Sequence, residues 1–318
     1  MIKYEKEMIM KNKLLKILIC AVLVAAVVFG GILLFYTLEN RSVVKVQEVT
    51  VKSEKINAPF RAVQLSDLHG TEIGKENEKL VTAVTNAEPD IILMTGDMFS
   101  RDGTGYEETL TLIESLYGIA PIYYSLGNHE DDHFRANEDE KEEMIGEISD
   151  RGAVVLEHEY EDISIAGADI RLGGFFGYAT DPDPSYFEKL QEEGYFENWR
   201  FDEAWNGGKD DSFLKKIKLT DRFVLLMCHV PDSYILFNGF EKYPADLILS
   251  GHLHGGQIIL PLAGPVFAPN QGIFPEKTEG LFSDGSSQLY LSKGLGSGKP
   301  VPRINNSPEI TVIDVVPG

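Results

Sequence analysis

Cysteine is scarce in this chain, which has only two in 318 residues. Cys20 lies in an apolar run near the N-terminus and Cys228 ends another, so the sequence offers no disulfide framework of the kind found in small secreted domains. Positive charge is also short: 29 Lys and Arg stand against 50 Asp and Glu, a formal net charge of −21. A field of that sign repels polyanions and argues against a nucleic acid duplex as partner.

Charge of either sign is absent from residues 17–38, a run of 22 residues. A helix rises about 1.5 Å per residue, so such a run is about 33 Å long and can cross a bilayer core; we predict one transmembrane helix there. Five Lys and two Glu precede it, which predicts a cytoplasmic N-terminus at 1–16 and an extracytoplasmic domain in the cell membrane. A cleaved signal peptide is the alternative, although no small-residue cleavage site ends the run.

The rest of the chain contains no repeat. Residues 39–57 alternate Val with polar residues, a pattern typical of a stalk that leads into an edge strand, and we expect residues 58–318 to form one domain. Predicted strands and helices first alternate, which favours parallel strands with crossover helices, and two facing sheets accommodate the later strands. The predicted strands are 60–65, 90–94, 121–126, 153–156, 163–166, 170–174, 223–228, 246–249, 257–260, 288–291 and 309–315, and the predicted helices are 75–87, 106–117 and 138–148.

An insertion rich in Phe, Tyr and Trp spans residues 175–218. Such a segment can cover an active-site cleft or lie in a membrane interface, where Trp and Tyr are favoured. The alternative is that its aromatic rings pack beneath a long loop. The sequence leaves both open.

Short polar clusters follow the predicted strands. Ligands of open α/β sheets bind beyond the carboxyl ends of the strands, so these clusters are the candidate site. Five of the seven histidines of the chain lie in them. The clusters are SDLHG with Asp67 and His69, TGDMF with Asp97, LGNHE with Asn128 and His129, CHVPD with His229, and SGHLHGGQ with His252 and His254.

Imidazole, carboxylate and amide oxygen form a ligand set suited to manganese, iron or zinc, rather than the all-oxygen shell that magnesium or calcium prefers. Two divalent ions together activate a water molecule and stabilise both oxygens of a displacement at phosphorus. Residues i and i+2 beyond a strand end can point the same way, which suits Asp67 with His69 and His252 with His254. One such residue alone is more often a cap or a satisfied polar core residue, whereas five clusters in succession favour a metal site.

The order D-x-H, G-D, G-N-H, an isolated His and G-H-x-H resembles the calcineurin-like metallophosphoesterase family over residues 58–318. The resemblance implies a four-layer α/β/β/α sandwich, preceded here by the transmembrane helix. It implies one ion on Asp67, His69, Asp97 and His254 and a second on Asp97, Asn128, His229 and His252. It also implies a hydroxide shared by the ions as nucleophile, with Asp67 and His129 as catalytic residues.

His129 is expected to protonate the leaving oxygen or to stabilise charge on the phosphoryl group. The alternative is an imidazole that only orients Asp67 through a hydrogen bond. Two positions depart from the family pattern. Ser100 stands where a second Asp is common after G-D, so the role of that carboxylate is missing or replaced. Glu130 replaces the usual Asp after G-N-H.

The GHLHGGQIILP stretch and the SKGLGSGKPVPR stretch resemble a membrane-anchored subgroup that includes phosphodiesterases and hydrolases of UDP-2,3-diacylglucosamine-type lipids. We therefore expect a phosphoester substrate, with phosphodiesters favoured and lipid-linked ones included, and no obligate protein partner. An extracytoplasmic site counts against cytosolic UDP-linked lipids. Arg303 is a candidate for binding a substrate phosphate, with a solvated surface arginine as the alternative.

Two other functions compete with this interpretation. A scaffold that keeps the metals but has lost catalysis is expected to lack ligands or the histidine at 129, and this chain has all of them. A nucleotide or oligonucleotide phosphohydrolase needs no basic stripe, so it stays open as a second enzymatic alternative.

Overall fold

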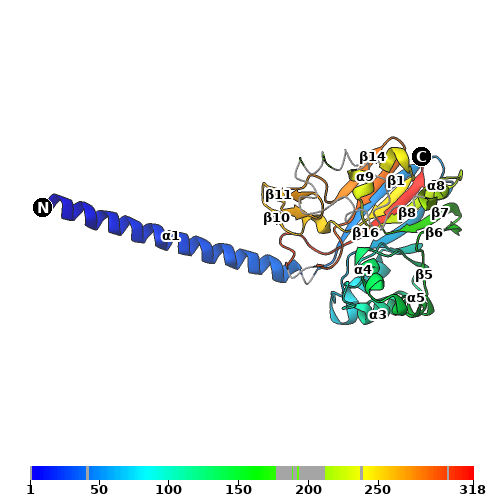
Figure 1. The fold of residues 1–318 in the computed structure, drawn as a ribbon, viewed down its shortest axis with the longest axis horizontal. Coiled ribbons are helices and arrows are strands. Elements are labelled where there is room, and N and C mark those ends of the chain that lie inside the picture. The colour runs from blue at the N-terminus through cyan, green and yellow to red at the C-terminus, as the bar shows by residue number, and fades with distance from the viewer. Residues whose placement is uncertain are drawn as a thin grey trace.

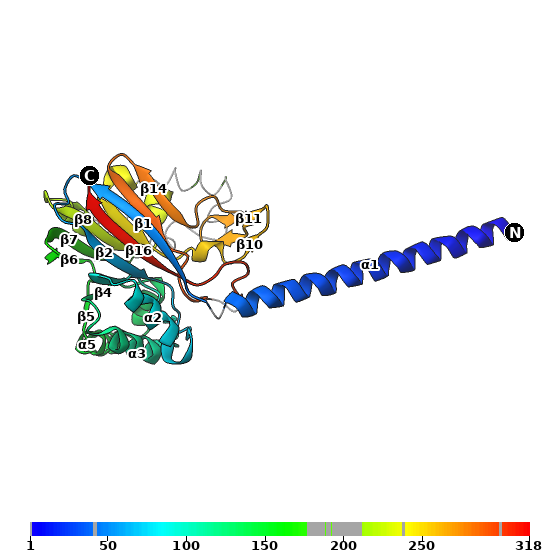
Figure 2. The same ribbon diagram turned by 180° about the vertical axis from the view of Figure 1, so that it is seen from behind.

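The computed structural model describes residues 2–40, 43–176, 188, 192, 212–236, 239–298 and 301–318. Helix α1, Ile2–Asn40, projects from one end of a folded domain, with the N-terminus at its far end (Figures 1 and 2). None of the helices in the described part of the chain combines the length and the apolar character needed to cross a membrane. The transmembrane helix predicted at 17–38 is therefore not confirmed.

The first of two large sheets has the strand order β1-β16-β2-β3-β4-β5. Strands β2 to β5 are parallel neighbours, as the alternation of predicted strands and helices indicates, and β16 is antiparallel to β2. The strands are β1 Lys45–Ser53, β2 Phe60–Leu65, β3 Ile91–Met94, β4 Ile122–Tyr124, β5 Ala153–Val155 and β16 Glu309–Pro317. The helices between them are η1 Lys75–Asn77, α2 Glu78–Asn86, α3 Tyr106–Leu116, α4 Asn128–Ala136, η2 Glu138–Glu140 and α5 Lys141–Asp150.

The second sheet has the order β14-β15-β9-β8-β7-β6, with parallel strands at its centre and an antiparallel hairpin at each edge. Its strands are β6 Glu159–Ile165, β7 Ala168–Phe175, β8 Phe223–Cys228, β9 Leu247–Ser250, β14 Gly280–Asp284 and β15 Ser287–Leu291. The short helices near it are α8 Ser212–Ile217, α9 Asp232–Ile235, α10 Gly239–Lys242 and η3 His254–Gly256. Four two-residue strands follow η3: β10 Ile259–Leu260, β11 Gly264–Pro265, β12 Phe267–Ala268 and β13 Gly272–Ile273.

The inner strands of each sheet are buried on both faces, whereas the edge strands β1, β6 and β14 are largely exposed. In β3, Ile91 and Leu93 join the apolar cluster between the two sheets, while Ile92 and Met94 join the cluster beneath the helices of the first sheet. Successive side chains of a strand point to opposite faces, so a strand covered on both sides is a continuous apolar run. Strand β8 divides its six residues in the same way between the central cluster and one beneath α8 and α10. The layers are thus helix, sheet, sheet and helix, as predicted.

The structure differs from the sequence predictions in several segments, including the short elements α8 to α10 and β11 to β13, which were not predicted. Helix α4 was not predicted, because its NHEDDHFRA sequence has few apolar positions, and strand β14 was missed as well. The strand predicted at 257–260 is reduced to Ile259–Leu260. Strand β1, at the edge of the first sheet, begins within the predicted stalk, at Lys45. Most of the insertion at 175–218 lies outside the described residues.

Candidate metal centre

The five motif loops meet at one edge of the two sheets. The loops with Asp67, Asp97 and Asn128 follow the neighbouring strands β2, β3 and β4, and those with His229 and His252 follow the neighbouring strands β8 and β9. Because all five strands run in parallel within their sheets, their carboxyl ends lie at a common edge. This explains why residues far apart in the sequence come together.

Backbone hydrogen bonds tie the loops to one another. The N–H of Asp67 donates to the carbonyl of Gly96 and that of His69 to the carbonyl of Asp97, both at 3.0 Å. These bonds continue the β2–β3 ladder beyond the last residues of the strands. Across the sheets, the N–H of His252 donates to Asp67 Oδ1 at 3.0 Å. The site is therefore held by backbone contacts as well as by its side chains.

Two of the three ligand groups in the described part of the chain that could hold an ion each contain three of the four ligands predicted for one ion. Asp67, His69 and His254 form one, and Asp97, His229 and His252 form another, each with ligand atoms within 4.8 Å of one another. The carboxylate of Asp97 lies 3.1 Å from His229 Nε2 and 3.8 Å from His69 Nε2. Asp97 therefore lies between the two groups, where the family resemblance implied a shared ligand.

Five of the seven predicted metal ligands have left-handed backbone conformations. Their φ angles run from 47° to 70°, a region that few residues other than glycine occupy. Such conformations cost about 1–3 kcal/mol each and persist where the surrounding structure enforces them, most often at functional sites. The five residues are Asp67, His69, Asp97, His252 and His254. The backbone is thus strained at five positions that carry predicted metal ligands.

Several buried polar atoms of the centre lack a hydrogen-bond partner among the described residues. They are His69 Nδ1 and Nε2, Asn128 Oδ1 and His252 Nε2. Leaving such an atom unsatisfied costs about 1–3 kcal/mol, which a native core seldom tolerates in a cluster. Imidazole nitrogens and an amide oxygen around two buried carboxylates fit divalent cations, because each of these atoms can donate a lone pair.

The protonation states favour ligation. Burial lowers the pKa of His69 and of His252 to about 3 each, so both rings are neutral at pH 7, the form that binds a metal. Burial alone would lower the pKa of His229 too, but the carboxylates of Asp97 and Asp67 raise it to about 10. His229 Nδ1 lies 2.7 Å from the carbonyl of Thr95, an orientation that leaves Nε2 facing the carboxylates. A cation between those carboxylates would take the place of the proton.

His129 lies beside Asp97. Its backbone N–H donates to Asp97 Oδ1 at 2.8 Å, its Nε2 is 4.0 Å from Asp97 Oδ2, and its ring is 4.6 Å from that of His69. The ring also accepts the backbone N–H of Arg101 at Nδ1, at 3.3 Å. Within the described residues, the hydrogen bond to Asp67 that the alternative role required is not formed. His129, His69 and Asp97 also make up the third group that could hold an ion.

Glu130 is a buried residue whose role sequence reasoning missed. Its carboxylate accepts the backbone N–H groups of Asp97, Met98 and Gly127 at 2.7–2.9 Å and the hydroxyl of Tyr124 at 2.6 Å. It thereby fixes the loop that carries Asp97. A signal was present, because an acidic residue three positions after a helix N-cap often reaches back to the cap N–H.

Arg303 is buried, with 6% of its surface exposed, so the alternative of a solvated surface arginine is wrong. Its Nε donates to the carbonyl of Gly296 at 2.7 Å, and its Nη2 donates to that of Lys293 at 2.6 Å and lies 3.4 Å from His254 Nδ1. The guanidinium therefore holds the loop at 293–298 against the centre through hydrogen bonds. Its position beside His254 is compatible with the predicted contact to a substrate phosphate.

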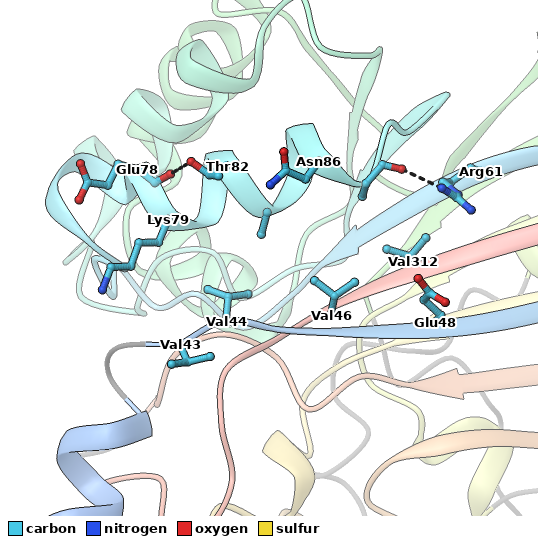
Figure 3. A pocket seen from close by; sticks show the side chains of 12 residues that line it. Val43, Val44, Val46, Glu48, Arg61, Glu78, Lys79, Thr82, Asn86 and Val312 are labelled. Atoms are coloured by element: carbon cyan, nitrogen blue, oxygen red, sulfur yellow. Dashed lines mark hydrogen bonds between the residues drawn. The ribbon is translucent and has the colours of Figure 1, made fainter.

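A separate cavity of about 670 Å³ lies between β1 and α2 (Figure 3). Val44, Val46 and Ala83 line it, and Lys79 and Arg61 are among its polar residues. None of its lining residues belongs to the five motifs. This cavity is not part of the metal centre.

Known proteins resemble this chain over most of its length. A model of the calcineurin-like phosphoesterase family matches residues 60–256, a span that contains every predicted metal ligand. The chain is similar to the uncharacterized metallophosphoesterase YkuE of Bacillus subtilis, with 28% identity over 85% of this chain and 84% of YkuE. It is also similar, at 26% identity in each case, to phosphodiesterase YaeI of Escherichia coli over 81% of this chain and 83% of YaeI, and to UDP-2,3-diacylglucosamine pyrophosphatase LpxG of Chlamydia muridarum over 80% of this chain and 83% of LpxG.

Proposed function

The chain belongs to the calcineurin-like phosphoesterase family, and from that premise we propose that it hydrolyses phosphodiesters at a centre of two divalent metal ions. It is a metallophosphoesterase, a hydrolase of phosphoric ester bonds. The observation that carries the proposal is the cluster of buried, unsatisfied ligand atoms on either side of Asp97. Without bound cations these unsatisfied atoms would only lower the free energy of unfolding, because each buried polar atom without a partner destabilises the fold.

The proposed ligands are the two groups on either side of Asp97, with Asp97 added to the first group and Asn128 to the second. Asp67, His69, Asp97 and His254 would hold one ion, and Asp97, Asn128, His229 and His252 would hold the other. When bound, two such ions supply Lewis-acid stabilisation and lower the pKa of a coordinated water toward neutrality. The mixed donor set favours manganese, iron or zinc.

His129 is the proposed partner of the leaving oxygen. Burial lowers the pKa of His129, so at pH 7 its ring is neutral and has one N–H to donate. A fixed N–H of this kind can stabilise the charge that develops on the leaving oxygen, and one such hydrogen-bond donor typically contributes about 10²–10³ to a rate. The bond from its backbone N–H to Asp97 fixes the base of the side chain. Arg303, braced beside His254, is the proposed contact for a substrate phosphate.

Lipid-linked phosphodiesters are the favoured substrates. The name of YaeI supports a phosphodiester as substrate, and the name of LpxG, a UDP-2,3-diacylglucosamine pyrophosphatase, supports a lipid-linked one. We also propose that residues 17–38 anchor the chain in the cell membrane with the N-terminus cytoplasmic. The uncharged sequence supports this, as do the exposed apolar side chains along α1, among them Ile17, Val22 and Val27. A site outside the membrane would meet lipid headgroups rather than cytosolic nucleotides.

Turnover by the full chain in detergent tests the catalytic proposal. The protein is stripped with a chelator, given manganese, iron or zinc, and assayed on bis-p-nitrophenyl phosphate and p-nitrophenyl phosphate. We expect metal to restore turnover and the diester to be the better substrate. A preference for the monoester would contradict the phosphodiesterase assignment. No turnover with any metal would favour the catalytically silent scaffold.

Accessibility of engineered cysteines tests the proposed orientation. In intact cells, a membrane-impermeant maleimide should label Leu219→Cys in the folded domain and leave Lys3→Cys unlabelled. The reverse labelling pattern, or release of the chain from membranes by washing with carbonate, would contradict the proposed anchor.

A further inference from the structure

An uncharged arm extends from the centre. Residues 257–275 contain β10 to β13, which pair as two small antiparallel hairpins. No charged residue occurs from Gly255 to Pro275, although a quarter of the whole chain is charged. We call residues 257–275 the hairpin arm.

The hairpin arm exposes large apolar side chains where turns normally carry polar ones. Leu262 is fully exposed, Ile273 is 72% exposed, and Phe267 and Phe274 are exposed as well. Leu262 and Phe274 have left-handed backbones, with φ of 69° and 57°, a conformation that turns usually assign to Gly or Asn. Neither the exposure nor the turn geometry of Leu262 and Phe274 is favourable in water, and exposed apolar groups of this kind often mark an interaction surface.

The hairpin arm is rigidly joined to the metal centre. The backbone N–H of Gln257 donates to the carbonyl of His254 at 3.0 Å, and the side chain of Asn306 donates to the same carbonyl at 2.7 Å. Asn306 also donates to the carbonyl of Gln257 at 3.2 Å, and Gln257 Nε2 donates to Ser297 Oγ at 3.0 Å. Whatever binds the arm is therefore held next to His254.

The hairpin arm also lies at the end of the domain that faces α1. Both views have β10 and β11 toward the side from which α1 projects (Figures 1 and 2), whereas Figure 1 shows α8 toward the opposite end. Strand β1 begins at Lys45, five positions after α1 ends at Asn40. A membrane that holds α1 would therefore face the apolar tips of the arm.

We propose that the hairpin arm is a membrane-contacting element, whose tips at Leu262 and at Ile273 and Phe274 insert into the interface of a lipid bilayer. An uncharged apolar surface suits a bilayer, and binding strength scales with the apolar area buried there. A second copy of the chain is a poorer occupant, because each copy carries a formal charge of −21. The inference rests on the proposed function and deepens it: the arm would position the centre at the headgroups, where a lipid-linked phosphodiester is presented.

Fluorescence quenching in vesicles tests the contact. The full chain with Cys20→Ala and Leu262→Cys is labelled with an environment-sensitive fluorophore and reconstituted into phosphatidylcholine vesicles that contain nitroxide-labelled lipid. Buried Cys228 does not compete for the label. The matched control is Leu219→Cys beside α8, because Leu219 is also a highly exposed leucine, at 72%.

We expect blue-shifted, lipid-quenched emission at position 262 and water-like, unquenched emission at 219. Water-like emission at both positions would overturn the proposal. An emission shift at 262 that grows with protein concentration and resists quenching by the lipid would assign the arm to a contact between copies, which also overturns it.

Turnover separates this inference from the proposed function. Leu262→Asp combined with Ile273→Asp should reduce hydrolysis of a vesicle-embedded glycerophospholipid diester by about tenfold or more, because both tips then resist insertion. Turnover of soluble bis-p-nitrophenyl phosphate should stay within about twofold of the parent chain, which shows that the variant is folded. Equal losses on both substrates would contradict a membrane role. If the parent chain cleaves no soluble diester, the proposed function fails, while the quenching experiment still decides the role of the arm.

Discussion

The backbone N–H of His252 donates to the carboxylate of Asp67 at 3.0 Å, across 185 residues of sequence and between the two sheets. Ser66 Oγ donates to the same carboxylate at 2.7 Å. Asp67 is therefore oriented by the first sheet and by the second at once. Because the loops after β2 and β9 meet at this carboxylate, the packing of the sheets and the geometry of the centre depend on each other.

Asp97→Asn should abolish metal-dependent turnover. Its carboxylate is the nearest anionic neighbour of His229, and the amide removes a full negative charge from between the two ligand groups. Even residues that only support metal ligands cost about 10–100-fold in affinity when lost, so we expect a larger loss here. Metal content by mass spectrometry and turnover of bis-p-nitrophenyl phosphate measure it. Exposed Asp102 in the same loop gives the control, Asp102→Asn, and full turnover by Asp97→Asn would contradict the two-metal assignment.

His129→Ala should keep the metals and slow turnover by about 10²–10³, the usual contribution of one fixed hydrogen-bond donor to developing charge. The expected retention of metal follows from the ligand groups on either side of Asp97, which do not need this ring. His133→Ala on the same helix is the control, because that ring faces the carbonyl of Arg101 and the carboxylate of Glu140. Loss of metal in His129→Ala would mean that His129 is a ligand, as its place in the third group allows.

Gly127→Ala should weaken metal binding. A Cβ at this position would overlap the Oδ1 and the backbone nitrogen of Asp97, so one of the two loops must shift. Gly146→Ala is the matched control, since its Cβ would meet nothing within 4 Å and it lies inside helix α5. There, alanine should stabilise the protein by up to about 1 kcal/mol. Metal titration and urea unfolding distinguish the two variants, and equal metal affinity in both would contradict close packing at Gly127.

Asp232 should make the protein less stable as the pH rises. Burial raises the pKa of Asp232 from 3.8 to about 7, although a hydrogen bond from Asn270 acts in the opposite direction. Between about pH 4 and pH 7 the folded state keeps this proton while the unfolded state has released it. The free energy of unfolding therefore falls across that window, through the contribution of this residue.

Asp232→Asn should make that fall less steep, because the amide does not titrate. Urea unfolding of the chelated protein from pH 4 to pH 8 measures the slope. Some pH dependence should remain, because burial and the neighbouring Asp97 raise the pKa of Glu130 to about 7 as well. Asp169→Asn, at an exposed position, should leave the slope unchanged, and an unchanged slope in Asp232→Asn would contradict a buried, protonated carboxyl.

The strands that position the centre were predictable because they are buried on both faces. Residues 223–228 are an apolar run of strand length and residues 60–65 are mostly apolar, and β8 and β2 have those bounds. Helix α4 was not predictable in the same way. Its residues are mostly polar, and Glu130 turns inward to hold backbone N–H groups, so it has little apolar periodicity.

The sequence by itself determined the ligand types, their order along the chain and the strands that carry them, because these are local properties of residue chemistry and hydrophobic pattern. Only the tertiary structure decided which side chains meet. Asp67 and His252 are brought together by the packing of two sheets, and Arg303 acts through burial that no local pattern encodes. The exposure of Leu262, Ile273 and Phe274 in the hairpin arm is likewise a property of the tertiary structure, which buries most other large apolar residues of the domain. Contacts between distant segments follow from strand order and layer packing, which depend on the whole chain at once.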